Sequence, residues 1–146
     1  MQVSRSRNGR LRRLVVAFAL ALCAASAAVA AADAVAVVVN PSVEVDDLSF
    51  ADLRKIMLGD RQFWTSGQPI TIIVRGPVSH ERTLVLQKVY KMTEDQYRQH
   101  WVAKVFRAEV TAGPRVVVSN DEAVSLVSVI QGAIAVVAAE DVPEGL

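Results

Sequence analysis

Cysteine is almost absent from this sequence of 146 residues, and histidine is scarce. The one cysteine, Cys23, lies in an N-terminal apolar run, so removal of that run as a leader would leave none. Disulfide scaffolds, thiol nucleophiles and cysteine-bound zinc would then be excluded. His80 and His100 fall on different predicted helices without a third ligand at metal spacing, so we expect no metal site.

Positive charge is also scarce once the N-terminus is set aside. Five of the 16 Lys and Arg residues lie in the first 13 positions, where there is no acid. The rest of the chain has 11 basic and 15 acidic residues, a net charge of about −4 in place of +1. A mildly acidic domain without a basic patch displaces few counterions from nucleic acid, so we expect no nucleic-acid partner.

The basic N-terminus begins a pattern that is typical of a secretory signal peptide. Its arginines are followed by an apolar run from Leu14 to Ala32, which contains the small residues Ala28-Val29-Ala30 near its end. We expect residues 1–30 to be a signal peptide that is cleaved after Ala30, with cleavage after Ala32 as the second choice. Residues 31–146 would then form a periplasmic or secreted domain.

Two other interpretations of the leader stay open. The apolar run is about as long as the roughly 20 residues that span a bilayer, so an uncleaved membrane anchor is one of them. The other is a lipoprotein, which would use Cys23, although the preceding Leu22 is bulkier than the small residue that such sites favour.

Short apolar runs alternate with helical patterns over the rest of the chain, without internal repeats. Strands separated by helices predict a single three-layer α/β domain, with a mostly parallel four-stranded sheet and helices on both faces. The expected strands are 34–39, 69–74, 115–118 and 133–138, and the expected helix N-caps are Ser49, Ser79, Thr93 and Ser119. Gly59 and Gly132 are the expected helix terminators.

Two of the predicted helices carry many apolar residues. The helix after Thr93 is expected to bury one apolar face, formed by Tyr97, Trp101, Val102, Val105 and Phe106. The helix after Ser119 is apolar nearly all round, so we expect it to be well buried. A ligand platform built from Trp64, Tyr97, Trp101 and Phe106 is conceivable, but aromatic residues at these spacings more often belong to the core, which is our prediction.

The segment Arg75–Thr83 is the strongest candidate for a site. It runs from a strand end into a helix start and brings free backbone N–H groups together with arginines and hydroxyls. Helix N-termini bind anions, and Arg75 could add a bidentate contact to a phosphate or carboxylate. Ligands of parallel sheets bind beyond the carboxyl ends of the strands, so Asn40 and Ser119-Asn120 are further places to look for a site. Of these, Asn40 and Ser119 are added to the candidate site residues.

A purely structural interpretation of the same segment stays open. In this interpretation Ser79 only caps the helix, Glu81 only stabilises its first turn, and Arg82 is a solvated charge. Glu81 also counts against anion binding, because a carboxylate in the first turn competes for the same N–H groups.

No arrangement for catalysis is evident. Ser79, His80 and Glu81 could be written as a triad, but adjacent residues on a helix do not face one another. Nothing else pairs titratable groups for acid–base or nucleophilic chemistry. We therefore expect a protein that is not an enzyme, with no catalytic residues and no cofactor.

Several segments, in order, resemble the phosphate-binding proteins of bacterial ABC transporters. Val37–Pro41 resembles a strand that ends near Asn-Pro, and Leu48–Gly59 resembles a helix that ends in Leu-x-x-Ile-(Phe/Met)-x-Gly. Phe63–Ile70 resembles the Trp and strand entry that follow, and Gly132-Ala-Ile134 resembles the family's closing Gly-Ala-Ile-Gly-Tyr segment. The resemblance covers nearly all of residues 31–146.

The resemblance implies a short, single-lobe form of a PstS-like protein, with a periplasmic binding protein-like domain over residues 31–146. Arg75 matches the family's strand-terminal Arg, and Ser79 with Thr83 lies where its Ser-Gly-Thr loop would be. The implied ligand is phosphate or another small oxyanion, held by these three residues with Asn40 and Ser119 at the rim. The implied partner is an ABC transporter permease or a second lobe-like protein.

The sequence also departs from the family pattern. Ser-Gly-Thr is replaced by Ser79-His-Glu-Arg-Thr83, and Ala135-Val136 replaces Gly-Tyr. Full members close two lobes around the ligand, whereas about 116 residues supply one, so the ligand would stay in contact with water, where charge interactions are weaker. The alternative is an envelope protein-interaction module that keeps the fold without binding a ligand.

Overall fold

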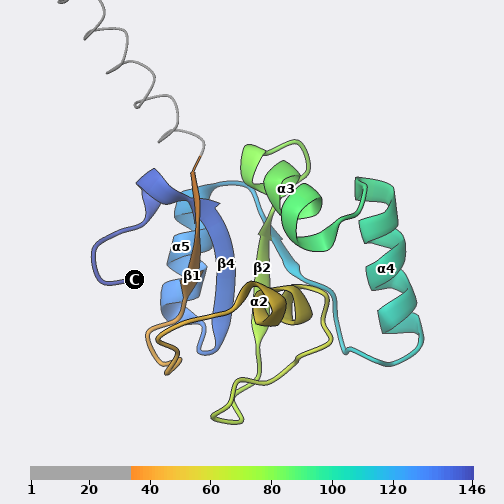
Figure 1. The fold of residues 1–146 in the computed structure, drawn as a ribbon, viewed down its shortest axis with the longest axis horizontal. Coiled ribbons are helices and arrows are strands. Elements are labelled where there is room, and N and C mark those ends of the chain that lie inside the picture. The colour runs from red at the N-terminus through yellow and green to blue at the C-terminus, as the bar shows by residue number, and fades with distance from the viewer. Residues whose placement is uncertain (1–33) are drawn as a thin grey trace, which may run out of the picture. The chain divides into compact units, whose positions relative to one another are not determined.

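A four-stranded sheet organises residues 34–146, the part of the chain that the computed structural model describes (Figure 1). Its strands are β1 (Val35–Val39), β2 (Thr71–Arg75), β3 (Arg115–Val117) and β4 (Ala133–Ala138). The spatial order is β1-β4-β2-β3, in which β2 is parallel to both neighbours and β1 is antiparallel to β4. The predicted mostly parallel α/β sheet is confirmed, with one antiparallel strand at its edge.

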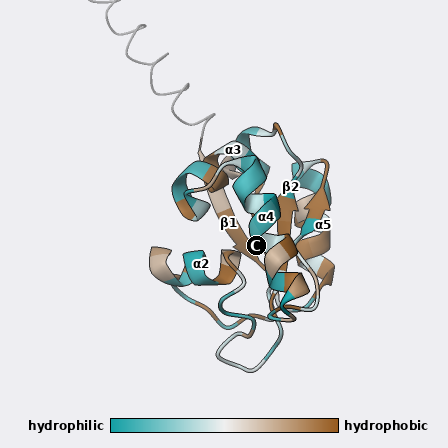
Figure 2. Ribbon diagram, turned by 90° about the vertical axis from the view of Figure 1, so that its right-hand side faces the viewer, coloured by the Kyte–Doolittle hydropathy of each residue, from teal (hydrophilic) through white to brown (hydrophobic). Residues whose placement is uncertain are grey.

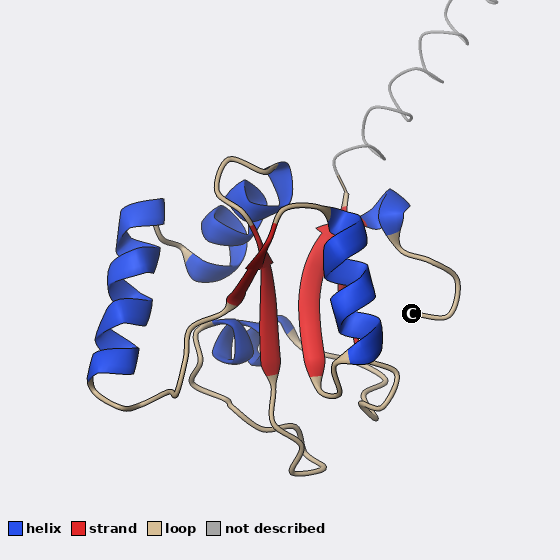
Figure 3. Ribbon diagram, turned by 180° about the vertical axis from the view of Figure 1, so that it is seen from behind, coloured by secondary structure: helices blue, strands red, loops and turns tan. Residues whose placement is uncertain are grey.

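Helices lie on both faces of this sheet, as Figure 3 shows from behind. One face is covered by α2 (Phe50–Met57), α3 (His80–Val85), the π-helical turn η1 (Leu86–Tyr90) and α4 (Glu94–Phe106). The other face is covered by α5 (Asn120–Val129), and a 3-10 turn, η2 (Ala139–Asp141), follows β4. None of the helices within residues 34–146 is long and apolar enough to cross a bilayer.

The strands supply two separate cores because successive side chains point to opposite faces. Ile134 and Val136 of β4 pack with α2, α3, η1 and α4, whereas Ala133, Ala135 and Val137 pack with α5. Every residue of β4 is buried, in keeping with a strand that is covered on both faces. Figure 2 shows the strands in hydrophobic colours and the helices in mixed ones.

The predicted helix starts agree with the structure. The side chains of Ser49, Ser79, Thr93 and Ser119 each accept a hydrogen bond from the backbone N–H three residues on. Thr93 and Gln96 form the expected capping box. The helix that was predicted after Ser79 is divided, because an α-helical start gives way to the π-helical turn η1.

The prediction of the α4 core face is partly wrong. Tyr97 and Trp101 are buried, but Val102, Val105 and Phe106 are exposed, with Phe106 91% exposed. The buried stripe of α4 consists of Tyr97, Trp101 and Lys104. Assigning Trp64, Tyr97 and Trp101 to the core is confirmed, whereas assigning Phe106 to it is wrong. α4 meets the core along one narrow stripe, so apolar residues outside that stripe face solvent.

The prediction that α5 is well buried is also wrong. Only Ala123 and Val127 of α5 are buried, and Val129 is 72% exposed. Among the described residues, α5 is the one helix on its face of the sheet, so no further layer covers its outer side. The signal peptide, its two alternatives and Cys23 all lie in residues 1–33, outside the described part of the chain.

Candidate functional site

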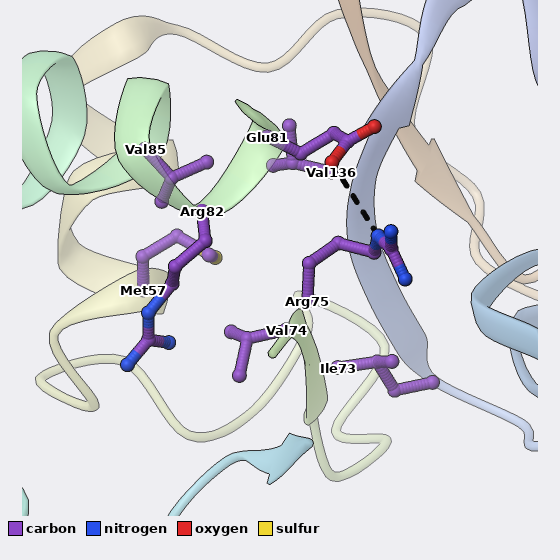
Figure 4. A pocket seen from close by; sticks show the side chains of 8 residues that line it. All are labelled: Met57, Ile73, Val74, Arg75, Glu81, Arg82, Val85 and Val136. Carbon is purple, nitrogen blue, oxygen red and sulfur yellow. Dashed lines mark hydrogen bonds and ion pairs between the residues drawn. The ribbon is translucent and has the colours of Figure 1, made fainter. Parts of the chain in front are cut away.

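Arg75 is the last residue of β2, at the end of the sheet where the parallel strands terminate. Its side chain is 13% exposed, and its Nε donates to Oε2 of Glu81 at 3.4 Å (Figure 4). Its Nη1 is buried and has no hydrogen-bond partner within residues 34–146. A guanidinium has five N–H donors, so Arg75 is a half-buried cation with unused hydrogen-bonding capacity.

Glu81 is the carboxylate that compensates this cation. It is 7% exposed, and its Oε1 accepts from Nδ2 of Asn120 at 2.8 Å. Burial raises the pKa of Glu81, but the hydrogen bonds from Asn120 and from its own backbone, together with the Arg75 charge, leave that pKa below its ordinary value. Glu81 is therefore ionised at neutral pH and holds the position that an anion bound to Arg75 would take.

Asn120 is a further member of this cluster, at a position that the strand-end rule marks in the sequence as a place for ligand binding. Besides Glu81, its Nδ2 donates to Oδ2 of Asp141 at 2.7 Å, and its Oδ1 is buried without a partner in the described part of the chain. Asn120 is the first residue of α5, directly after the predicted Ser119 cap. That position lies beyond the carboxyl end of a parallel strand, where the sequence predicts a ligand site, but the contact with Glu81 shows only in the fold.

The hydroxyls of Ser79 and Thr83 are both engaged in local structure. Ser79 Oγ donates to the Gly76 carbonyl at 3.0 Å and accepts from the Arg82 N–H at 3.2 Å. Thr83 Oγ1 donates to the Ser79 carbonyl at 3.0 Å. Because a hydroxyl has one proton to donate, either residue could donate to an anion only by giving up its present bond.

Arg82 does not contribute to the Arg75 cluster. In Figure 4 its side chain points away from Arg75, and it forms a two-pronged ion pair with Glu94 at 2.7 and 3.1 Å. Its guanidinium carbon also lies 3.8 Å from the ring centroid of Tyr97. Arg82 is 4% exposed, so its interpretation as a solvated charge is wrong.

Asn40 and Ser119 lie at different ends of the sheet. Asn40 pairs with Ala133 at the start of β4, and its side chain donates to the carbonyls of Val127 and Ser128 at 2.7 and 3.1 Å. β1 is antiparallel to β4, so its carboxyl end lies opposite to that of β2, and Asn40 is not close to Arg75. Ser119 lies beside Asn120 at the Arg75 end, where its Oγ accepts from the Glu122 N–H.

A small cavity adjoins Arg75 within residues 34–146. A cavity of about 10 Å³ lies between Arg75, Glu81, Arg82 and the apolar side chains beneath them. That volume holds roughly one water molecule, so a tetrahedral oxyanion fits only after side chains move. Within residues 34–146, no group of three or more His, Cys, Asp or Glu residues could hold a metal ion.

Comparison with known proteins relates this geometry to solved structures only. No family profile and no curated protein sequence matches the chain. An ABC-type phosphate transport receptor from Vibrio cholerae superposes with a TM-score of 0.59 at 20% identity, covering 75% of this chain and 42% of that one. PstS from Borrelia burgdorferi superposes with a TM-score of 0.56 at 19% identity, covering 71% and 40%.

A third neighbour, from Clostridium perfringens, is a protein of the phosphate ABC transporter substrate-binding type whose crystal structure contains bound phosphate. It superposes with a TM-score of 0.59 at 18% identity, covering 75% of this chain and 41% of its own. The chain thus spans about two fifths of the length of these neighbours. Residues 35–146 have the fold of one lobe of a PstS-like binding protein.

Proposed function

We propose that this chain is an exported, solute-binding-like protein that binds phosphate or a similar oxyanion at Arg75. One observation carries the proposal: Arg75 is a largely buried cation with a single long contact and a buried Nη1 that has no partner among the described residues. Its position at the carboxyl end of a parallel strand is where α/β sheets bind ligands. The phosphate-related neighbours support the same ligand class.

In this proposal the anion exchanges with the Glu81 carboxylate. Glu81 moves away from Arg75, and the incoming oxyanion takes the guanidinium donors, with Ser79, Thr83 and Ser119 as further donors after their local bonds rearrange. Because Glu81 is ionised at neutral pH, the charge-assisted contact between Arg75 and Glu81 is replaced by a similar contact between Arg75 and the oxyanion. Binding is therefore weak, unless an ABC transporter permease, a second copy or another lobe-like protein covers the site.

A protein-interaction module of the cell envelope is the second candidate. It is favoured by the Arg75–Glu81 pair and by the volume of only about 10 Å³ in the cavity that these residues line within the described part of the chain. Two exposed apolar side chains also follow the carboxyl ends of β2 and β3. They are Val78, which is 96% exposed, and Val118, which is 85% exposed. Such residues suit a protein contact more than an anion site.

Calorimetric titration with phosphate, with sulfate as the comparison, tests the proposal. The samples are the purified wild-type protein and the variants Arg75→Gln, Glu81→Gln and Lys88→Gln. Lys88→Gln is the control, because it removes an exposed positive charge away from Arg75. Glu81→Gln should tighten phosphate binding by about 10-fold or more, because a charge-assisted hydrogen bond contributes about 1.5–3 kcal/mol. Arg75→Gln should abolish binding, and Lys88→Gln should leave it unchanged.

Two results would separate the candidates. Saturable binding that Arg75→Gln removes supports the anion site, even if the wild-type protein binds weakly. No binding by folded wild-type and folded Glu81→Gln protein would refute the anion site and favour the interaction module. Mass spectrometry of the exported protein tests the leader separately, because cleavage after Ala30 predicts a mature N-terminus at Ala31.

A further inference from the structure

A second concave region lies at the other end of β2, away from Arg75. It is a cleft of about 490 Å³ between the loop before β2, the start of β2, α4 and the segment before β3. This volume is within the range of roughly 300–1,000 Å³ that is typical of small-molecule sites. The site described above plays no part in it, since Arg75 and Glu81 are not among its lining residues.

The cleft has an apolar floor and an exposed aromatic side chain. Trp101 and Val110 line it and are 7% and 9% exposed, and Ile70 is half-buried. Phe63 also lines the cleft but is 58% exposed. An aromatic ring left in solvent beside a buried apolar floor provides a surface on which a flat apolar ligand can stack.

The polar groups of the cleft favour an anion. Arg61 and Arg115 line it, and none of its described lining residues is an acid, although residues 31–146 contain more acids than bases. Arg61 is committed elsewhere, because it donates to the Phe63 carbonyl and to Thr65 Oγ1 and lies 3.8 Å from a carboxylate oxygen of Asp52, outside the cleft lining. Arg115 is exposed and makes no ion pair or side-chain hydrogen bond with the described residues, so it can bind an incoming carboxylate.

The backbone before β3 adds hydrogen-bond donors. The N–H groups of Thr111, Ala112 and Gly113 donate no hydrogen bond within residues 34–146, and all three residues line the cleft. Successive free N–H groups next to a guanidinium are a suitable environment for a carboxylate. The apolar floor and Phe63 would then contact the rest of the ligand.

We propose that this cleft binds a small organic carboxylate with a flat apolar body, at a site separate from Arg75. The carboxylate binds Arg115 and the backbone N–H groups of Thr111–Gly113, while the apolar body lies against Phe63 and the floor formed by Trp101. The proposal does not rest on the phosphate proposal, because the two sites lie at opposite ends of β2.

Three probes test it on the purified protein. Indole-3-acetate combines a carboxylate with a flat apolar ring, indole-3-acetamide has the same ring without the charge, and inorganic phosphate has the charge without the ring. Indole-3-acetate should bind saturably and about fivefold more tightly than the amide, as expected for an exposed ion pair. Amide NMR shifts should locate it at Thr111–Gly113 and leave Ser79–Arg82 unmoved.

Two variants test which residue contacts the carboxylate of the ligand and which contacts its apolar ring. Arg115→Gln should remove the preference for the acetate over the amide, and Phe63→Ala should weaken both ligands to a similar degree. The controls lie outside the cleft. Lys88→Gln removes an exposed basic residue, to match Arg115→Gln, and Phe106→Ala removes an exposed phenylalanine, to match Phe63→Ala. The proposal is overturned if indole-3-acetate does not bind, if it shifts only Ser79–Arg82, or if neither cleft variant changes its affinity.

Discussion

Replacing Gly132 by alanine tests how the start of β4 is fitted to the rest of the fold. Gly132 has a φ of +75°, and a Cβ at this position would lie 2.2 Å from the Pro69 carbonyl oxygen. The Gly132 carbonyl also accepts hydrogen bonds from the Thr71 N–H at 3.2 Å and from Trp64 Nε1 at 2.9 Å. The obstructing atom belongs to the backbone, so a side-chain rotation cannot relieve the contact.

The magnitude follows from three costs. An L-residue in the left-handed region costs about 1–2 kcal/mol. Overpacking against a fixed neighbour costs about 1–3 kcal/mol. Weakening the two hydrogen bonds at the Gly132 carbonyl costs about 1 kcal/mol for each bond. Because alanine also restricts the unfolded chain, which offsets about 0.4–1 kcal/mol, we expect Gly132→Ala to lower the free energy of unfolding by about 4 kcal/mol.

Gly67→Ala is the matched control. Gly67 has a φ of +84°, but a Cβ there would meet nothing within 4 Å, so only the backbone conformation is penalised. We expect this variant to lose about 1 kcal/mol or less. Urea unfolding, followed by tryptophan fluorescence, measures the free energy of unfolding of both variants, because Trp64 and Trp101 are buried and become exposed on unfolding. If Gly132→Ala and Gly67→Ala proved equally stable, the predicted clash with Pro69 would be refuted.

Three further predictions concern other contacts. Asn40→Ala should lower the free energy of unfolding by about 2–3 kcal/mol, because two α5 carbonyls lose a buried donor. If the same variant changed the phosphate affinity measured by calorimetry, that result would contradict the placement of Asn40 away from Arg75. The hydrogen bonds from Arg82 lower the pKa of Glu94, so this ion pair stabilises the fold above the ordinary carboxyl pKa of 4.5 and its contribution is lost as pH falls through the lowered value. Glu94→Gln should therefore cost about 1–2 kcal/mol at pH 7 and little at pH 2 in urea unfolding, and an equal cost at both pH values would count against the ion pair. Trp101→Ala should cost about 3–5 kcal/mol, whereas Phe106→Ala should stay within about 0.5 kcal/mol, and similar losses for the two in the same assay would contradict the α4 packing.

Local signals in the sequence were sufficient for much of the fold. A helix cap depends on residues three positions apart, so Ser49 and Thr93 could be identified from the sequence. Likewise, β4 could be assigned from an uninterrupted apolar run, which is typical of a strand covered on both faces.

Features that depend on distant parts of the chain could not be predicted in the same way. The placement of Asn40 required the direction of β1, which is set by its pairing with β4 almost a hundred residues later. The burial of Arg82 required its partner Glu94, which lies on the following helix. The exposure of Phe106 depends on how α4 lies against the core, because periodicity groups apolar residues without showing which of them meet a neighbour.

The Arg75–Glu81 pair connects the stability of this lobe to its proposed ligand affinity. A guanidinium that is 13% exposed is costly to leave unpaired, and one lobe by itself leaves an anion at the proposed site in contact with water. An internal carboxylate solves the first problem, because it compensates Arg75 whether or not a ligand is present. At the proposed anion site the same carboxylate lowers ligand affinity, since an oxyanion must first displace it. Glu81→Gln should therefore destabilise the ligand-free protein and increase the stabilisation that phosphate provides, two effects that follow from one contact.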